Sequence, residues 1–388
     1  MVDIERFEQL VRENHATLGN AVRAKEVFRA WRNYYGPVWS KTYTAVRKVW
    51  LPFEQWLQCN APQVYASLEG ALDWQHDQSL REMADSSFGS EPLRFLTMLY
   101  HLHNGQDMEE YHQYGLFGTY ECYDQLASVL WLSMDSIQEI QFFDANIKIF
   151  AWCPGTGKHL AVVTGLGQYH QRIRDLVGHV VEISTYDDTY TDHGLADSFL
   201  TKYCSDVMAG ILPVRAGPNV GRISMFPNKG GLSSTTITNG IAVTITLLYS
   251  VELIHEGHTF TYCIRMRYTG REAVGWDQCQ LVSRHWVYVH DSKRVENYSG
   301  YGVRGEHPIL SIENPYHEYC SRMQYINGTE IVQKLYGAYK FVPGTIEKPL
   351  GMPFRVQIPE LPLTEPTSLK VPQMMQSTES DEQTFNVI

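Results

Sequence analysis

The feature that most constrains the fold is a strict two-residue alternation that begins near residue 237. Large apolar side chains alternate with small or polar ones over residues 241–249 and 260–268, and the pattern continues in 281–289 and 354–358. Successive side chains of a strand point to opposite faces, so this pattern predicts half-buried strands. Several such strands in succession predict an antiparallel β-sandwich or barrel over residues 237–364.

Residues 1–60 have a different period and are predicted to form a helical segment. Apolar side chains recur there at steps of three or four residues, most clearly at Trp39, Tyr43, Val46, Trp50, Phe53 and Leu57. Such a stripe is typical of a helix face that packs against a core. Pro52 lies inside the stripe, and we expect it to kink or restart the helix.

Residues 61–211 mix both periods and predict an α+β domain. Pro92 suits the first turn of a helix that ends at the turn signal 103–105. Two short strands are expected on either side of the turn 154–157, and a last helix is expected from Asp197 to Gly210.

Two further segments differ in composition from their neighbours. Residues 212–236 are rich in Gly, Pro, Asn and Ser and are predicted to be a linker. Residues 365–388 are rich in Ser, Thr, Glu and Gln and are predicted to be a disordered tail. The chain is thus expected to be an α+β multidomain protein, with N-terminal helices, an α+β domain and a C-terminal antiparallel sandwich.

Charge and cysteine content disfavour several functional classes. The chain has 32 Lys and Arg against 43 Asp and Glu, a net charge of −11, which disfavours nucleic acid as a partner. It has neither a run of about 18 apolar residues nor a secretory signal at its start, so no membrane association is expected. Seven scattered cysteines without C-x-x-C predict free thiols, which suits the cytoplasm and nucleus.

Two glycine-rich stretches match nucleotide-binding motifs only in part. Residues 300–305 fit G-x-G-x-x-G, but they lie among strands and Pro308 follows, so no helix can begin there. We predict a glycine-shaped loop in a β domain, whose backbone N–H groups can still hold an anion. Residues 154–159 lack the first glycine and the hydroxyl residue of a phosphate-binding loop, so they predict a hairpin turn.

The sequence contains no recognisable catalytic constellation. Residues 255–258 are one residue short of H-E-x-x-H, and no G-x-S-x-G occurs. We therefore expect no enzyme activity, no cofactor and no metal site. The candidate binding residues are Arg284, Trp286, Gly300, Gly302, Val303, Arg304, Gly305 and Glu306.

Among these candidates, the two arginines and the tryptophan have different expected roles. A guanidinium group suits carboxylates or phosphates, which favours Arg284 and Arg304 as contacts. Trp286 either fills the sandwich core or is an exposed anchor for a partner.

Residues 237–364 resemble the ApaG domain family. The matching stretches are 260–266, 280–286, 300–306 with Pro308, 316–321, 337–339 and 354–359. This resemblance implies a fibronectin-type-III-like β-sandwich.

Residues 62–211 resemble the SUKH (Smi1/Knr4-type) family. The residues that carry the similarity are 91–95, 100–106, the hairpin around Gly155, and 197–199 with Tyr203. A SUKH domain followed by ApaG is the arrangement of the F-box only protein 3 family, and residues 43–50 resemble its connecting helix. The resemblance implies a substrate-recognition component of a Skp–cullin–F-box ubiquitin ligase, which binds target proteins and performs no chemistry itself.

The front of the chain departs from that family. It has no Leu-Pro opening with a leucine-rich run, and only Ala24–Trp31 with Trp39 is similar to the second half of an F-box. We therefore expect the F-box to be missing or vestigial. Docking on the Skp linker and cullin stays open, and the alternative is a ubiquitin-independent SUKH–ApaG scaffold for a partner protein or an anionic ligand.

Overall fold

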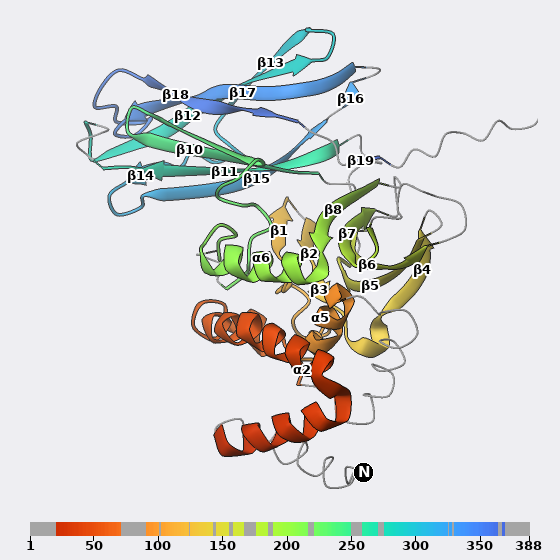
Figure 1. Ribbon diagram of the computed structural model, residues 1–388. Coiled ribbons are helices and arrows are strands. Elements are labelled where there is room, and N and C mark those ends of the chain that lie inside the picture. Colours follow the sequence, from red (N-terminus) through yellow and green to blue (C-terminus); the bar gives the residue numbers. More distant parts are fainter. Residues whose placement is uncertain are drawn as a thin grey trace, which may run out of the picture.

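Two β-rich domains are stacked on one another, a strand-only sandwich above a sheet with helices (Figure 1). The computed structural model describes the following ranges: 21–70, 91–100, 102–123, 125–142, 145–154, 158–166, 176–184, 189–215, 221–249, 258–270, 275–324, 326–327, 330–363 and 367–368. None of the helices in these ranges combines the length and the apolar character that crossing a lipid bilayer requires.

Within the described ranges, the first domain has four helices, a short 3₁₀ turn and the strands that precede residue 196. The helices are α2 (Ala21–Asn60), α3 (Pro62–Ala66), α5 (Glu91–Tyr100) and α6 (Ala196–Met208), with the 3₁₀ turn η1 (Met134–Ser136). The strands are β1 (Thr119–Cys122), β2 (Gln125–Ser128), β3 (Leu130–Trp131), β4 (Gln138–Phe142), β5 (Ala145–Trp152), β6 (Lys158–Leu166), β7 (His179–Ser184) and β8 (Thr189–Leu195).

An antiparallel sheet forms the centre of this domain. Its strand order is β19-β8-β7-β6-β5-β3, with β4 also paired to β5, and β19 (Thr367–Ser368) comes from near the chain end. The strands β5 and β6 pair as the predicted hairpin. Residues 155–157 of its turn lie outside the described residues, whereas the two strands are confirmed.

Helix α2 contributes the predicted apolar stripe to the domain core. Val46, Trp50, Phe53 and Leu57 are at most 2% exposed, whereas Trp39 lies outside the described side chains. The helix is continuous through Pro52, so the expected restart there does not occur. Because this stripe shares one core with α5, α6 and the sheet, the predicted segment 1–60 is not a separate unit: its described part belongs to the first domain.

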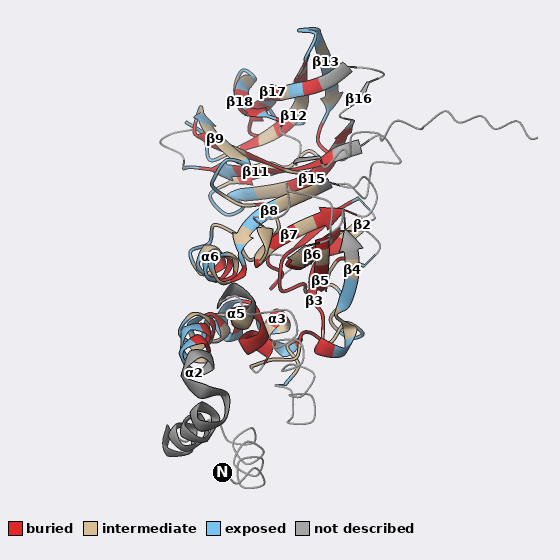
Figure 2. Ribbon diagram, turned by 45° about the vertical axis from the view of Figure 1, so that its right-hand side comes forward, coloured by how far each residue is buried: buried red, intermediate tan, exposed pale blue. Residues whose placement is uncertain are grey.

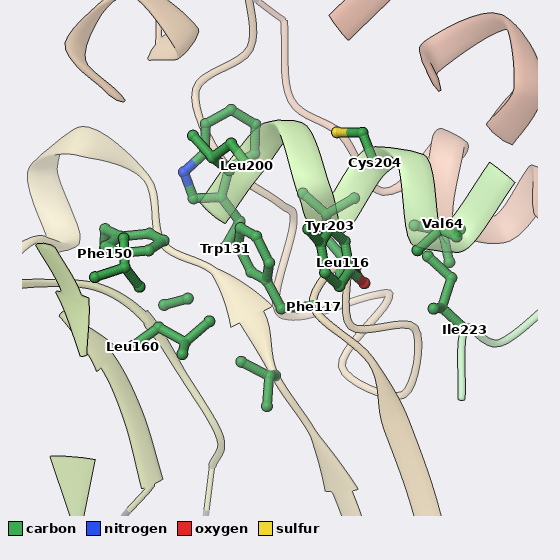
Figure 3. Packing of buried hydrophobic residues seen from close by; sticks show 14 of the residues in the cluster. Val64, Leu116, Phe117, Trp131, Phe150, Leu160, Leu200, Tyr203, Cys204 and Ile223 are labelled. Atoms are coloured by element: carbon green, nitrogen blue, oxygen red, sulfur yellow. Dashed lines mark hydrogen bonds between the residues drawn. The ribbon is translucent and has the colours of Figure 1, made fainter. Parts of the chain in front are cut away.

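Helix α6 packs beside α2 and α5 and contributes to the same core. Figure 3 shows Leu200 and Tyr203 of α6 pointing toward Phe117 and Trp131. The Tyr203 hydroxyl donates a hydrogen bond to the carbonyl oxygen of Leu116. The helix is therefore held by both apolar packing and a buried polar contact.

The second domain is a sandwich of two antiparallel sheets. Its strands are β9 (Ser233–Thr238), β10 (Ile241–Tyr249), β11 (His258–Tyr268), β12 (Gln278–His290), β13 (Val295–Tyr301), β14 (Ile309–Ser311), β15 (Tyr316–Gln324), β16 (Ile326–Asn327), β17 (Glu330–Pro343) and β18 (Phe354–Pro362). One sheet has the order β15-β11-β10-β9, and the other runs β13-β12-β17-β16 with β14 and β18 at its sides. The predicted alternation is confirmed, since one apolar face of each main strand is buried (Figure 2).

Residues 212–236 do not form the predicted free linker. Ile223 and Phe226 are fully buried in the first domain's core, and Ser224 forms a parallel bridge with Thr119. From Ser233 the segment is already strand β9 of the sandwich. The described part of this segment is therefore packed against the first domain through Ile223 and Phe226, and it is not a free connection.

The predicted disordered tail at 365–388 lies largely outside the described residues. Thr367 and Ser368 are the exception, because they pair as β19 with β8 of the first domain.

A buried ionic cluster joins the two domains. The Glu318 carboxylate of β15 accepts from Arg265 Nε of β11 at 2.7 Å, and it pairs with Arg215 Nη2 at 3.0 Å. Arg215 belongs to the segment between the domains, and the Arg265 side chain also donates to the carbonyl oxygen of Phe226 at 2.9 Å. All three charged side chains are largely buried, at 6–16% exposure.

The role of α2 in the core can be tested with Phe53→Ala. Phe53 is fully buried and packs edge-on against Trp50 and Tyr203. Removing a buried ring leaves a cavity, so we expect the free energy of unfolding of the first domain to fall by about 3–5 kcal/mol. Urea denaturation measures this change. The exposed Gln58→Ala in the same helix should leave stability unchanged, and equal effects of the two variants would contradict the assignment of α2 to the core.

The ionic cluster predicts a defined response to acid. Burial alone would raise the pKa of Glu318, but the guanidinium groups of Arg215 and Arg265 outweigh it and hold the pKa below its ordinary value of 4.5. A lowered folded-state pKa stabilises the fold above the ordinary value, and the stabilisation is lost as pH falls through the folded-state pKa.

Glu318→Gln tests this response. At neutral pH it leaves two buried guanidinium groups without their carboxylate, so we expect a loss of about 3–5 kcal/mol in the free energy of unfolding. Denaturation across pH should show a smaller acid-induced loss in the variant than in the native chain. The exposed Glu313→Gln is the control and should keep the acid response of the native chain. If Glu313→Gln reduced the acid-induced loss as much as Glu318→Gln does, the role of the cluster would be refuted.

Candidate ligand pocket at the domain junction

A pocket of about 430 Å³ opens between the edge strands β13 and β15 of the sandwich, where they face the β1–β2 turn of the first domain. Residues from both sheets and from the first domain line it: Tyr123, Tyr262, Arg284, Trp286, Tyr288, His290, Glu296, Tyr298, Tyr301, Val303, Arg304, Gly305, Tyr319, Ser321, Arg322, Met323 and Val332. The volume lies in the range of pockets that bind small molecules or single side chains.

The base of the pocket is aromatic and deeply buried. Tyr262, Trp286 and Tyr319 are 3–7% exposed, and the rings of Tyr262 and Trp286 lie 5.3 Å apart. The hydroxyls of Tyr319 and Tyr339 hydrogen-bond at 2.6 Å behind this base. Burial raises the pKa of the nearby Tyr288 to about 12, so its phenol stays neutral at physiological pH.

Three arginines stand around this base, and each has a distinct support. Arg284 Nη1 donates to the carbonyl oxygens of Tyr301 and Gly302, at 3.1 and 2.7 Å. A Cβ atom at Gly300 would come within 3.0 Å of the Arg284 guanidinium, so glycine there leaves room for that side chain.

The other two guanidinium groups, of Arg304 and Arg322, lie over the ring of Tyr123. Their centres are 4.9 and 5.2 Å from the ring centroid. The Tyr123 hydroxyl is also 2.9 Å from the Ser321 hydroxyl. A residue of the first domain thus holds two cationic side chains of the second, through cation–π contacts.

Among the described residues that line the pocket, Glu296 is the one carboxylate, and it already has partners. The Tyr298 hydroxyl donates to it at 2.7 Å, Arg294 donates to its other oxygen, and His290 pairs with it at 3.4 Å. The Tyr298 hydrogen bond, followed by Arg294, lowers the pKa of Glu296 and keeps it ionised. With this carboxylate engaged, the three arginines dominate the charge of the pocket.

The glycine loop shapes one side of the pocket. Gly302, Arg304 and Gly305 have φ angles of 56°, 50° and 81°, and the backbones of Val303 and Glu306 exchange two hydrogen bonds. A Cβ at Gly302 would lie 2.3 Å from the carbonyl oxygen of Glu306, so only glycine fits. Arg304 is a non-glycine residue in the left-handed region, a conformation that is concentrated at functional sites.

Most of the predicted binding residues meet at this pocket. Arg284, Trp286, Val303, Arg304 and Gly305 line it, whereas Gly300 and Gly302 shape its wall without lining it. The Glu306 side chain is exposed and does not line the pocket, and Glu306 closes the loop through its backbone. For Trp286 the structure favours the core alternative, because the side chain is 3% exposed and packs with the sandwich core.

Other lining residues were not predicted. Tyr288 and His290 continue the alternation of Arg284 and Trp286 along β12, so the period of two could have indicated them. Tyr123 carried no such signal, because it reaches the pocket from another domain.

The pocket's donors are guanidinium, phenol and indole groups, which suit the binding of an oxyanion attached to an aromatic or apolar body. Among the residues that the structure describes, no group of three or more His, Cys, Asp or Glu side chains lies close enough together to hold a metal ion.

The pocket lies in the part of the chain that matches a known family. The ApaG domain family model matches residues 252–343, a range that includes every lining residue except Tyr123. Protein ApaG from Nitrosospira multiformis is 33% identical over 135 residues, which are 33% of this chain and 93% of that protein.

Two F-box proteins are similar over longer stretches. F-box protein SKIP16 from Arabidopsis thaliana is 25% identical over 381 residues, covering 88% of this chain and 84% of that protein. F-box only protein 3 from Mus musculus is 25% identical over 313 residues, covering 76% of this chain and 61% of that protein, so the chain spans about three fifths of its length. The chain is thus a homologue of these F-box proteins and, through its C-terminal domain, belongs to the ApaG family.

Proposed function

We propose that this chain is the substrate-recognition component of a Skp–cullin–F-box ubiquitin ligase, and that it binds target proteins through the pocket between β13 and β15. The observation that carries the proposal is the pocket itself, with its aromatic base and cationic sides. The similarity to two F-box proteins over most of the chain supports the ligase context.

A recognition component acts by binding and not by chemistry. Tethering a target beside a ubiquitin-loaded enzyme raises the effective concentration of its lysines and makes the transfer effectively intramolecular. The Glu318 cluster helps such a role, because it holds the two domains, and with them the bound target, in one orientation.

We assign the first domain to the SUKH type and α2 to the connecting helix of the F-box only protein 3 family. Its antiparallel sheet with packed helices α2, α5 and α6 supports this assignment. The assignment places target binding on both domains, with the ApaG pocket as the main site.

The second candidate is a scaffold that is independent of ubiquitin and holds a partner protein or an anionic ligand. The three arginines of the pocket favour it, because they suit an oxyanion whether or not a ligase is attached. The two candidates differ in one property, which is docking on the Skp linker and cullin.

Affinity capture from cells, with mass spectrometry, separates the two candidates. The full chain is compared with residues 41–388, which keep the core stripe of α2 that begins at Val46. The ligase proposal predicts that Skp and cullin are recovered with the full chain and lost with the shorter form. Recovery with neither form would contradict the ligase role and favour the scaffold.

Gly302→Val tests whether partners bind through the glycine loop. The φ of 56° and the 2.3 Å approach to the Glu306 carbonyl oxygen leave no room for a side chain, so the loop that carries Arg304 must move. We expect co-purifying partners to be lost while the sandwich still unfolds cooperatively, with a cost of about 1–3 kcal/mol.

Gly231→Val is the matched control, because a Cβ there meets no atom within 4 Å. Unchanged recovery of partners with Gly302→Val would remove the loop from the site.

A further inference from the structure

We propose that the pocket binds an acidic peptide segment with an aromatic side chain, and that Tyr123 of the first domain completes this site. The aromatic ring would lie on the base formed by Tyr262, Trp286 and Tyr319, and flanking carboxylate or phosphate groups would meet the arginines. The inference rests on the proposed function in one respect, that the peptide belongs to a target protein.

The pocket changes from aromatic at its base to charged at its rim. The aromatic base is at most 7% exposed, whereas Tyr301 and Arg304 at the entrance are exposed. A ligand that enters therefore meets charge at the rim and apolar surface below. This order fits an aromatic anchor with acidic neighbours, and it does not fit a small inorganic anion alone.

The pocket is positively charged, which favours an acidic ligand. The chain as a whole has a net charge of −11, yet three arginines surround this one pocket. In the described part of the chain, neither Arg284 nor Arg304 forms an ion pair: the contacts of Arg284 are backbone carbonyls, and that of Arg304 is the Tyr123 ring. Each guanidinium has five N–H donors, so donors remain for a ligand's oxyanion.

One buried polar atom of a residue that lines the pocket is unpaired. Trp286 is 97% buried and lines the pocket, and its Nε1 donor has no hydrogen-bond partner within the described residues. Buried donors are nearly always satisfied in folded proteins. Because this nitrogen is itself buried, a peptide oxygen would reach it only with a shift of the residues at the base of the pocket.

Tyr123 makes the site depend on both domains. It lies at the β1–β2 turn with a φ of 57°, and its ring contacts the guanidinium groups of Arg304 and Arg322. The hydroxyl contact to Ser321 fixes the ring from β15. Tyr123 is therefore a positioning residue, which holds two arginines ready for the ligand and lowers the ordering cost of binding.

Selection from a random twelve-residue peptide library displayed on phage tests the ligand class. The full chain should enrich peptides that combine an aromatic residue with several acidic ones. Arg304→Gln should lose this enrichment, and the exposed Arg355→Gln on the same sandwich should retain it. Enrichment of basic or non-aromatic peptides, or acidic-aromatic enrichment that survives Arg304→Gln, would overturn the proposal.

The affinity of one selected peptide then tests the parts of the site. By fluorescence polarisation, Arg304→Gln should weaken binding about tenfold, as expected for the loss of a charge-assisted hydrogen bond. It should also reduce the salt dependence of the affinity. Tyr123→Ala should weaken binding several-fold, and Tyr123→Phe should recover most of the loss because it keeps the ring. Equal affinity of Tyr123→Ala and the native chain would remove the first domain from the site.

Two further measurements distinguish phosphate from carboxylate as the bound group, and the peptide site from the ligase role. Replacing the peptide's acidic residues by phosphoserine tells whether phosphate or carboxylate binds more tightly, and competition by millimolar inorganic phosphate alone should be weak. Strong competition by phosphate would contradict the need for the aromatic anchor. If peptides bind but Skp and cullin are not recovered, the ligase role fails while the site stands; the reverse result rejects the site alone.

Discussion

The buried pairing of Glu318 with Arg215 and Arg265 is the constraint on which the rest of the structure depends. It joins two strands of the sandwich to the segment that leaves the first domain. Buried charges carry a large desolvation cost, and they persist only where geometry satisfies them, so the cluster tolerates one relative placement of the domains. That placement brings Tyr123 to the edge of the sandwich, which turns an ordinary opening between two sheets into a site with walls from both domains.

The pocket also lies at an edge of the sandwich, between two end strands. Edge strands expose unpaired backbone groups that can pair with other chains, and proteins commonly blunt them with charged side chains. In the described residues, β13 and β15 are the end strands on one side of the sandwich, and the pocket with its arginines lies between them. Of the three arginines, Arg322 lies on the end strand β15, whereas Arg284 lies on the inner strand β12 and Arg304 on the glycine loop.

Much of the fold could be predicted from the sequence, because it depends on local periodicity. The alternation in 241–249 and 260–268 corresponds to β10 and β11, and the stripe from Val46 to Leu57 corresponds to the buried face of α2. The linker prediction was wrong because composition cannot show that Ile223 and Phe226, two apolar residues in a polar segment, are buried by another domain.

The site was predictable only as far as one strand and one loop. Arg284, Val303 and Arg304 follow from residue type and position within the second domain. Tyr123 does not, because its role arises from a contact almost 200 residues along the chain, between its hydroxyl and Ser321. Contacts between residues so distant in sequence depend on how the two domains dock, and local sequence patterns do not indicate the docking.

Site-specific photocrosslinking in cells tests the central claim, that partners bind at the pocket between the domains, most directly. A benzophenone amino acid would replace Tyr301, which is 82% exposed at the pocket entrance, or Met352, which is 86% exposed on the β17–β18 connection and does not line the pocket. The account predicts crosslinked partner proteins from position 301 and none from position 352. Crosslinking from 352 alone, or equally from both positions, would contradict it.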